Sequence, residues 1–206
     1  MATLTTLLQR CLALRERVSA DRPVFLGIVG PPGSGKSTMT DALHGASPDW
    51  GVIQMDGFHL SNEVLHSLGR RDRKGAPDTF DVAGFVSLLQ RARVEIGTVY
   101  APRFRREIEE PIASSIPINT SGPGVIVEGN YLLLQTGGWE MVASLLDEIW
   151  YVDTPADECR RRLIERASVT YGPIDGPKWV DAVDEPNSVL VRASADRASL
   201  RTTLEE

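Results

Sequence analysis

The sequence predicts an α/β fold in which a parallel β-sheet is covered by helices on both faces. Short apolar runs rich in β-branched residues recur along the chain, and stretches with helical periodicity lie between them. The runs are continuous rather than alternating, which is typical of strands buried on both faces. The five predicted strands are Val24–Val29, Val52–Met55, Val125–Val127, Ile149–Val152 and Val189–Val191.

The first two predicted helices rest on apolar spacing. Over Leu4–Val18, apolar residues recur at i, i+3 and i+4 with charges between them, which indicates an amphipathic helix. This helix packs either on its own domain or against a second subunit, so a homodimer stays open. After the first strand, Met39, Ala42 and Leu43 continue a helical pattern.

Two later helices are predicted from their start signals. Asp81 is expected to cap a helix whose apolar face begins at Val82 and Phe85. Thr154 is expected to cap another helix, with Pro155 at its first position. The stretches Gly69–Asp81 and Tyr171–Asn187 match neither pattern and are expected to be loops, and loops of that length are often functional lids.

Length and composition narrow the class of protein. The chain has 206 residues, which fits one domain over residues 1–206, with the amphipathic helix in 1–20 and lid-like segments at 69–81 and 158–187. Hydrophobic residues make up 42% and charged residues 24%, which excludes membrane, disordered and fibrous classes. The net charge of -6 argues against nucleic acid and anionic lipid as partners. Two cysteines without metal or redox spacing and no targeting segment indicate a cytoplasmic protein.

The strongest functional signal is a phosphate-binding loop. Residues 30–37 match the pattern GxxxxGKS/T between the first strand and a helix. Glycines let backbone N–H groups surround a phosphate chain, the lysine reaches its β- and γ-phosphates, and the serine hydroxyl holds Mg²⁺. The lysine is one of only three in the chain, with Lys74 and Lys178. The predicted nucleotide-binding residues are Gly30, Pro31, Pro32, Gly33, Ser34, Gly35, Lys36, Ser37 and Thr38.

Carboxylates are expected at the same edge of the sheet. Asp56 follows the second strand and Glu128 ends the third, and the carboxyl ends of parallel strands form the ligand crevice. Asp56 can orient an acceptor hydroxyl toward the γ-phosphorus, whereas Glu128 can organise Mg²⁺ together with Ser37. His59 either touches substrate or forms a hydrogen bond within its loop.

Basic residues form two further groups. Arg162 and Arg166 stand one helical turn apart, and this pairing of like charges is unfavourable unless an anion lies between them. The transferring phosphoryl group is such an anion, and a solvated basic face is the alternative. Arg70, Arg71, Arg73 and Lys74 form a denser run, which is either solvated or closes over an anionic or polyhydroxyl substrate.

Five motifs in this order resemble the phosphoribulokinase/uridine kinase family of P-loop kinases, which includes the type I pantothenate kinases. They are GPPGSGKST at Gly30–Thr38, MDGFHL at Met55–Leu60, RKGAPDTFD at Arg73–Asp81, VYAPRFRR at Val99–Arg106 and VIVEGNYLLL at Val125–Leu134. The resemblance extends from about residue 21 to 191 and is greatest to bacterial proteins described as fructose transport system kinases or nucleoside/nucleotide kinase family proteins.

The resemblance implies a three-layer P-loop NTPase fold whose five-stranded parallel sheet has the order 2-3-1-4-5. It implies ATP with Mg²⁺ as donor and Asp56 as the carboxylate that activates the substrate. It also implies that Lys74, Tyr100 and Arg106 face the acceptor or metal site beside Glu128. Arg162 and Arg166 would then belong to the lid, and Asn187 would meet adenine.

These observations predict an ATP-dependent kinase that phosphorylates a hydroxyl of a small metabolite, such as the sugar fructose. A nucleoside or pantothenate kinase would use the same mechanism on another acceptor. A third interpretation is an ATP-binding regulator of a transport system without turnover. Asp56 favours an enzyme, because a nucleotide sensor needs Lys36 and Ser37 but no carboxylate that activates an acceptor.

Overall fold

The main sheet has five parallel strands. The computed structural model describes residues 2–18 and 22–204. The strands are β1 (Val24–Val29), β2 (Gly51–Gln54), β5 (Gly124–Gly129), β6 (Glu148–Val152) and β7 (Leu200–Thr202), in the spatial order β2-β5-β1-β6-β7. All four pairings are parallel. When only the strands of this sheet are numbered in chain order, β5, β6 and β7 become its third, fourth and fifth strands. The spatial order is then 2-3-1-4-5, which confirms the order that the family resemblance implied.

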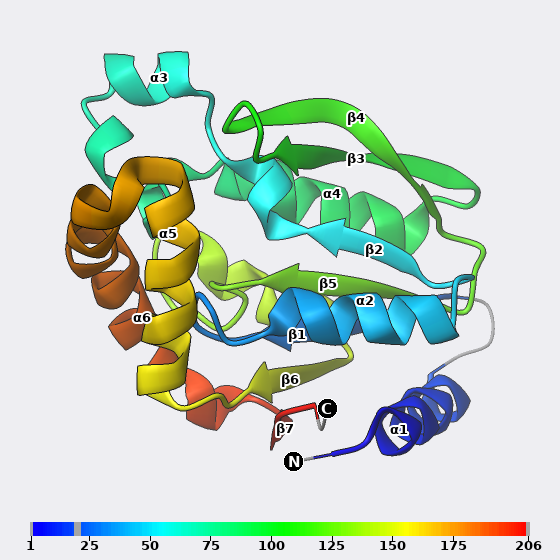
Figure 1. Ribbon diagram of the computed structural model, residues 1–206. Coiled ribbons are helices and arrows are strands. Elements are labelled where there is room, and N and C mark those ends of the chain that lie inside the picture. Colours follow the sequence, from blue (N-terminus) through cyan, green and yellow to red (C-terminus); the bar gives the residue numbers. More distant parts are fainter. Residues whose placement is uncertain (1, 19–21, 205–206) are drawn as a thin grey trace.

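Helices cover both faces of this sheet (Figure 1). On one face, α1 (Leu4–Arg17) and α2 (Lys36–Ala46) bury apolar side chains against Leu26 and Ile28 of β1. On the other face, α4 (Val82–Val94) packs with Phe25 and Val29 of the same strand. Successive residues of a strand point to opposite faces, so this central strand contributes to both cores. The predicted three-layer architecture is confirmed.

The remaining helices gather beside the carboxyl ends of the strands (Figure 1). Helix α5 (Ala156–Trp179) is interrupted at Gly172, where the backbone leaves helical geometry at φ 86°. A π-helical turn (Val180–Asp184) leads into α6 (Glu185–Arg192), and α3 (Asn62–Ser67) stands apart from them. None of the helices in the ranges 2–18 and 22–204 combines the length and the apolar composition needed to span a bilayer.

Two predictions for the region after residue 170 are wrong. The run Val189–Val191 belongs to α6, and the last strand is Leu200–Thr202 instead. Val191 is buried while Val189 is exposed, so burial follows one helix face rather than both faces of a strand. Tyr171–Asn187 is helical apart from the break at Gly172, although two prolines lie in α5.

The helix start at Thr154 also differs from the prediction. Pro155 is the N-cap of α5, and no side chain caps this helix. The Thr154 hydroxyl donates instead to the Ser34 carbonyl at 2.7 Å, which ties this segment to the loop after β1. In contrast, the Asp81 side chain accepts from the Gly84 backbone N–H at 2.9 Å and caps α4 as expected.

An antiparallel hairpin outside the main sheet was not predicted from the sequence. It consists of β3 (Thr98–Arg105) and β4 (Glu110–Asn119). Val99 and Ala101 of β3 are buried against the α4 side of the core, whereas Tyr100 between them is 56% exposed. The hairpin lies along the β2 edge of the sheet and contacts the turn that follows β2 (Figure 1).

A buried carboxylate anchors α1 to the sheet. The Glu148 side chain accepts hydrogen bonds from Arg10, from Arg17 at 2.8 Å and from the indole N–H of Trp150 at 2.6 Å. Burial acts to raise the pKa of Glu148, but these donors outweigh it and hold the pKa below its ordinary value. The charged form is therefore the one that stabilises the folded chain.

Replacing Glu148 should weaken the fold in a pH-dependent way. We expect Glu148→Gln to lower the free energy of unfolding at pH 7 by about 1–3 kcal/mol, because charge-assisted hydrogen bonds are lost. The folded-state pKa lies below the ordinary value of 4.5, so the loss should disappear as the pH falls below 4.5. Denaturant titrations between pH 3 and 8 measure it. Glu95→Gln, in an exposed pair with Arg91, is the control and should change nothing measurable.

Candidate active site

A cavity of about 1260 Å³ lies at the carboxyl edge of the sheet. Its walls come from the loop after β1, from the ends of β2 and β5, from the 69–81 segment, and from α5 and the helices that follow it. Most of the site residues expected from the sequence line this one cavity. They are Pro32, Gly33, Ser34, Gly35, Lys36, Ser37, Thr38, Asp56, His59, Lys74, Arg106, Glu128, Arg162, Arg166 and Asn187.

Three expected site residues do not line the cavity. Gly30 and Pro31 begin the P-loop, and the Pro31 carbonyl accepts a hydrogen bond from the Lys36 ammonium at 3.1 Å. Tyr100 lies on β3 with 56% of its surface exposed. In the part of the chain that the structure describes, Tyr100 has no contact with the cavity, and we assign it no role there.

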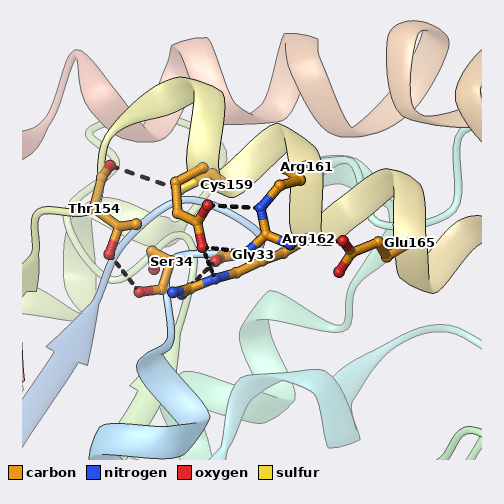
Figure 2. A network of polar contacts seen from close by, with 8 residues as sticks. Gly33, Ser34, Thr154, Cys159, Arg161, Arg162 and Glu165 are labelled. Carbon is orange, nitrogen blue, oxygen red and sulfur yellow. Dashed lines mark hydrogen bonds and ion pairs between the residues drawn. The ribbon is translucent and has the colours of Figure 1, made fainter. Parts of the chain in front are cut away.

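The P-loop is held in place by the start of α5. A Cβ atom on Gly33 would stand 2.6 Å from the Cys159 carbonyl oxygen, and φ is +77° there, so glycine is required on both grounds. The Arg162 guanidinium approaches the Gly33 carbonyl at 3.5 Å, and Thr154 donates to the Ser34 carbonyl. Figure 2 shows these side chains converging on the loop. The contact holds α5, which carries Arg162 and Arg166, beside the P-loop.

The P-loop has features that fit a bound phosphate. The Ser34 hydroxyl is buried and has no hydrogen-bond partner in the described part of the chain. Lys36, the first residue of α2, folds back onto the loop's own carbonyl. Burial lowers the pKa of Lys36, while Glu128 and Asp56 oppose that change. A phosphate would supply an acceptor for the hydroxyl and a counter-charge for the ammonium.

Asp56 is positioned by the hairpin. It lies in the single 3-10 turn Met55–Phe58 after β2, and a Cβ on Gly57 would stand 2.3 Å from the Pro102 carbonyl oxygen. This close approach brings Arg106 over the turn, where it pairs with the Asp56 carboxylate at 3.0 Å. Burial acts to raise the pKa of Asp56, but His59, Arg106 and Lys36 together hold it below its ordinary value. Asp56 is therefore ionised at neutral pH.

Glu128 differs from Asp56 in its protonation. It ends β5 with 9% of its surface exposed, and burial raises its pKa to about 7 although Lys36 acts in the opposite direction. Within the described ranges, no three or more His, Cys, Asp or Glu side chains are grouped so that they would hold a metal ion alone. Mg²⁺ commonly binds one or two protein groups together with substrate phosphates, and Ser37 and Glu128 fit that pattern.

His59 and Lys74 form the wall beside Asp56. The His59 ring packs against Phe80 and Phe104, and its Nδ1 lies 2.8 Å from the Asp56 carbonyl. Burial lowers the pKa of His59, although the neighbouring Asp56 carboxylate acts in the opposite direction. The Lys74 ammonium donates to Asn62 at 2.8 Å and to a backbone carbonyl of the hairpin turn, so much of its hydrogen bonding is internal.

Asn187 lines the cavity close to the 69–81 segment. Its side chain is 5% exposed, and its Nδ2 is 4.0 Å from where a Cβ would stand on Gly75. Gly75 belongs to the 69–81 segment, and the adenine contact expected for Asn187 from the sequence stays a prediction. Nearby, burial raises the pKa of Asp184 to about 6, with Arg166 opposing it. Arg166 has no ion-pair partner in the described part of the chain, whereas Arg162 pairs with Glu158 at 2.7 Å.

Several cavity residues had not been singled out from the sequence. Asp184, Tyr171 and Trp179 come from the stretch that was expected to be a loop, and the Tyr171 and Trp179 rings stack at 4.9 Å. Phe104 lies in the VYAPRFRR motif, which marked this region but not this residue. No local pattern identifies an aromatic side chain as part of a site, because the contact arises only when the chain folds.

The chain is similar to known kinases in sequence and in structure. No protein-family model matches the chain. The chain is 32% identical over 166 residues to a Schizosaccharomyces pombe protein named "Putative uridine kinase C227.14", covering 75% of this chain and 71% of that protein. The chain belongs to the phosphoribulokinase/uridine kinase family of P-loop kinases.

Two further relatives agree with membership of this kinase family. The chain is 31% identical over 151 residues to a pantothenate kinase from Latilactobacillus sakei, covering 70% of this chain and 49% of that enzyme. A crystal structure titled "putative fructose transport system kinase", from Silicibacter sp. TM1040, matches with a TM-score of 0.86 and 29% identity. It covers 98% of this chain and 100% of that one. The protein is a P-loop small-molecule kinase.

A methyl group added at Gly33 should push the P-loop away from the backbone of α5. We expect Gly33→Ala to weaken ATP binding by at least about tenfold, because the new Cβ would collide with the Cys159 carbonyl and strain the backbone. Titration of ATP by calorimetry measures the effect. Gly45→Ala is the matched control, since nothing lies within 4 Å of its Cβ position in α2. Equal affinities in the two variants would show that the contact does not shape the loop.

Proposed function

We propose that this kinase transfers the γ-phosphoryl group of ATP, bound with Mg²⁺, to a hydroxyl of a small metabolite, such as the sugar fructose. The cavity of about 1260 Å³ supports a two-substrate site. Pockets for a single small ligand usually measure about 300–1,000 Å³, so a nucleotide and a small acceptor fit together. The name of the Silicibacter relative, which refers to fructose transport, supports a sugar as the acceptor.

The position of Asp56 carries this proposal. Its carboxylate lines the same cavity as the P-loop, is ionised, and lies close enough to Lys36 for each to shift the other's pKa. An ionised carboxylate beside the γ-phosphate accepts a hydrogen bond from the acceptor hydroxyl and orients its oxygen for in-line attack. A nucleotide-binding regulator would not need this group.

The other side chains in the cavity would bind the donor, the transferring phosphoryl group and Mg²⁺. The P-loop N–H groups, the Ser34 hydroxyl and Lys36 hold the phosphate chain of the donor. Arg162 and Arg166 stand on one side of α5 and meet the charge that develops on the transferring phosphoryl group. Mg²⁺ held by Ser37, Glu128 and phosphate oxygens would neutralise charge on the donor phosphates.

The acceptor side is lined by groups that hold polar substrates. Arg106 pairs with Asp56, and His59, Lys74 and Asn187 line the same cavity. A nucleoside or pantothenate as acceptor would use the same Asp56 and the same donor site. A cytoplasmic location, a homodimer through α1 and the absence of a nucleic-acid partner stay predictions from the sequence.

Removing the charge of Asp56 should abolish most of the turnover. We expect Asp56→Asn to lower kcat by about 10²- to 10⁴-fold and to leave ATP affinity within about threefold, because the acceptor loses its orienting base. The measurement is Mg²⁺- and ATP-dependent ADP release with sugars, nucleosides and pantothenate as acceptors, with Lys36→Ala as the blank.

Asp175→Asn is the control for that experiment. Asp175 pairs with Lys178 on α5 and is exposed, so its replacement should leave turnover unchanged. Full activity in Asp56→Asn would remove the assigned role of this carboxylate. Flat rates with every acceptor, combined with tight ATP binding, would favour the regulator instead.

A further inference from the structure

Four basic residues in the segment 70–74 have different partners. Arg73 and Arg70 both pair with the Asp78 carboxylate, Arg73 at 2.7 Å and Arg70 at 3.4 Å. Arg70 also donates to the Asp78 carbonyl at 2.9 Å. Both guanidiniums therefore stabilise the segment itself, and neither lines the cavity in the described part of the chain.

The Lys74 ammonium also has partners within the protein. Its ammonium donates to Asn62 at 2.8 Å and to the Glu109 carbonyl, and it lies 5.2 Å from the centre of the Phe104 ring. The side chain is 7% exposed. Glu109 has a φ of 52°, an uncommon conformation for this residue type, and its carbonyl faces the ammonium. Lys74 thus fastens the 69–81 segment to the turn of the hairpin.

Arg71 is the exception in this run. It lines the cavity and is partly buried, and within the described ranges its side chain has no hydrogen bond or ion pair. Burial lowers the pKa of Lys74, and the charge of Arg71 lowers it further, so the two cations lie close together. Glu109 lines the same cavity without pairing to Arg71. An unpaired, partly desolvated guanidinium beside a second cation is unfavourable unless an anion binds there.

Printed contacts connect Asp56 to Arg71 along this wall. The His59 Nδ1 lies 2.8 Å from the Asp56 carbonyl, and the His59 ring packs against Phe104. The Lys74 ammonium lies 5.2 Å from the centre of the same Phe104 ring, and Arg71 begins the 3-10 turn that directly precedes Lys74. His59 and Lys74 therefore stand between Asp56 and Arg71 in this series of contacts. An acceptor that extends from Asp56 along this wall would reach Arg71 with its far end.

We propose that Arg71 binds an anionic group of the phosphoryl acceptor, a carboxylate or a phosphate, while the acceptor hydroxyl lies at Asp56. The inference rests on the proposed kinase function and narrows the substrate class to sugar acids, sugar phosphates and similar hydroxylated anions. The planar guanidinium matches both anions with two parallel hydrogen bonds. A neutral sugar would leave this charge without a counter-ion.

Matched pairs of acceptors test the proposal by turnover. The panel pairs glycerol with D-glycerate and glycerol 3-phosphate, and fructose with fructose 1-phosphate and fructose 6-phosphate. The wild type should have a higher kcat/KM for an anionic acceptor than for its neutral counterpart. Comparison of the carboxylate with the phosphate acceptors then identifies which anion is bound. Arg71→Met should lower kcat/KM for that member by about 10- to 100-fold, because a charge-assisted hydrogen-bonded pair is lost. Turnover of the neutral member should stay within about threefold.

Two further variants separate binding from folding. Arg71→Lys should recover part of the lost kcat/KM, since it restores charge but not the paired hydrogen bonds. Arg70→Met removes a neighbouring charge that pairs with Asp78 and should leave the ratio of anionic to neutral turnover unchanged. The unfolding midpoint of Arg71→Met should not fall below that of the wild type, because the Arg71 side chain has no partner in the described part of the chain to lose.

A binding measurement distinguishes failure of this inference from failure of the proposed function. With a non-hydrolysable ATP analogue and Mg²⁺ filling the donor site, D-glycerate or glycerol 3-phosphate should raise the melting temperature of the wild type but not of Arg71→Met. One contrary result is that neutral acceptors are turned over equally by the wild type and by Arg71→Met, while neither protein binds the anions. This result would overturn the role of Arg71 and leave the kinase function intact. Anion binding through Arg71 without any turnover would overturn the kinase function alone. If the protein showed neither anion binding nor turnover, both the role of Arg71 and the kinase function would be overturned.

Discussion

The contact between α5 and the P-loop is the constraint on which the site depends. At Gly33 the helix backbone comes so close that no side chain fits, and Thr154 adds a hydrogen bond to the next carbonyl of the loop. The loop is thereby fixed from outside the sheet as well as by β1. Because the same helix carries Arg162 and Arg166, the contact also sets where these cations stand relative to the P-loop.

Strand order explains why the two carboxylates behave differently. Strand β5 pairs with β1 on one side and β2 on the other, so Glu128 lies between the strand that leads to the P-loop and the strand that leads to Asp56. The central position is the more buried, which raises the pKa of Glu128 to about 7. Asp56 lies at the edge, where Arg106 of the hairpin pairs with it and keeps it charged. The sheet thus supplies one mostly ionised group and one that titrates near neutrality.

Features with a local signal could be predicted from the sequence, and features created by tertiary contacts could not. The P-loop and Asp56 were visible because each follows a strand in a fixed pattern. Thr154 has the residue type of a helix cap, yet its hydroxyl is used by the Ser34 carbonyl across the fold. Arg71 could not be told apart from Arg70, since only the folded position of Asp78 decides which guanidinium is paired. The helix over Val189–Val191 was missed because three apolar residues carry too little periodicity to separate it from a strand.

The distribution of lysines bears on the covalent chemistry of the protein. Lys36 and Lys74 are each 7% exposed in the cavity, whereas the side chain of Lys178 on the outer part of α5 is 71% exposed. Among the lysines, an amine-reactive label would therefore attach first at Lys178, on the segment that follows the break at Gly172. A dye coupled there would report on the environment of this outer helical segment and leave both cavity ammonium groups unmodified.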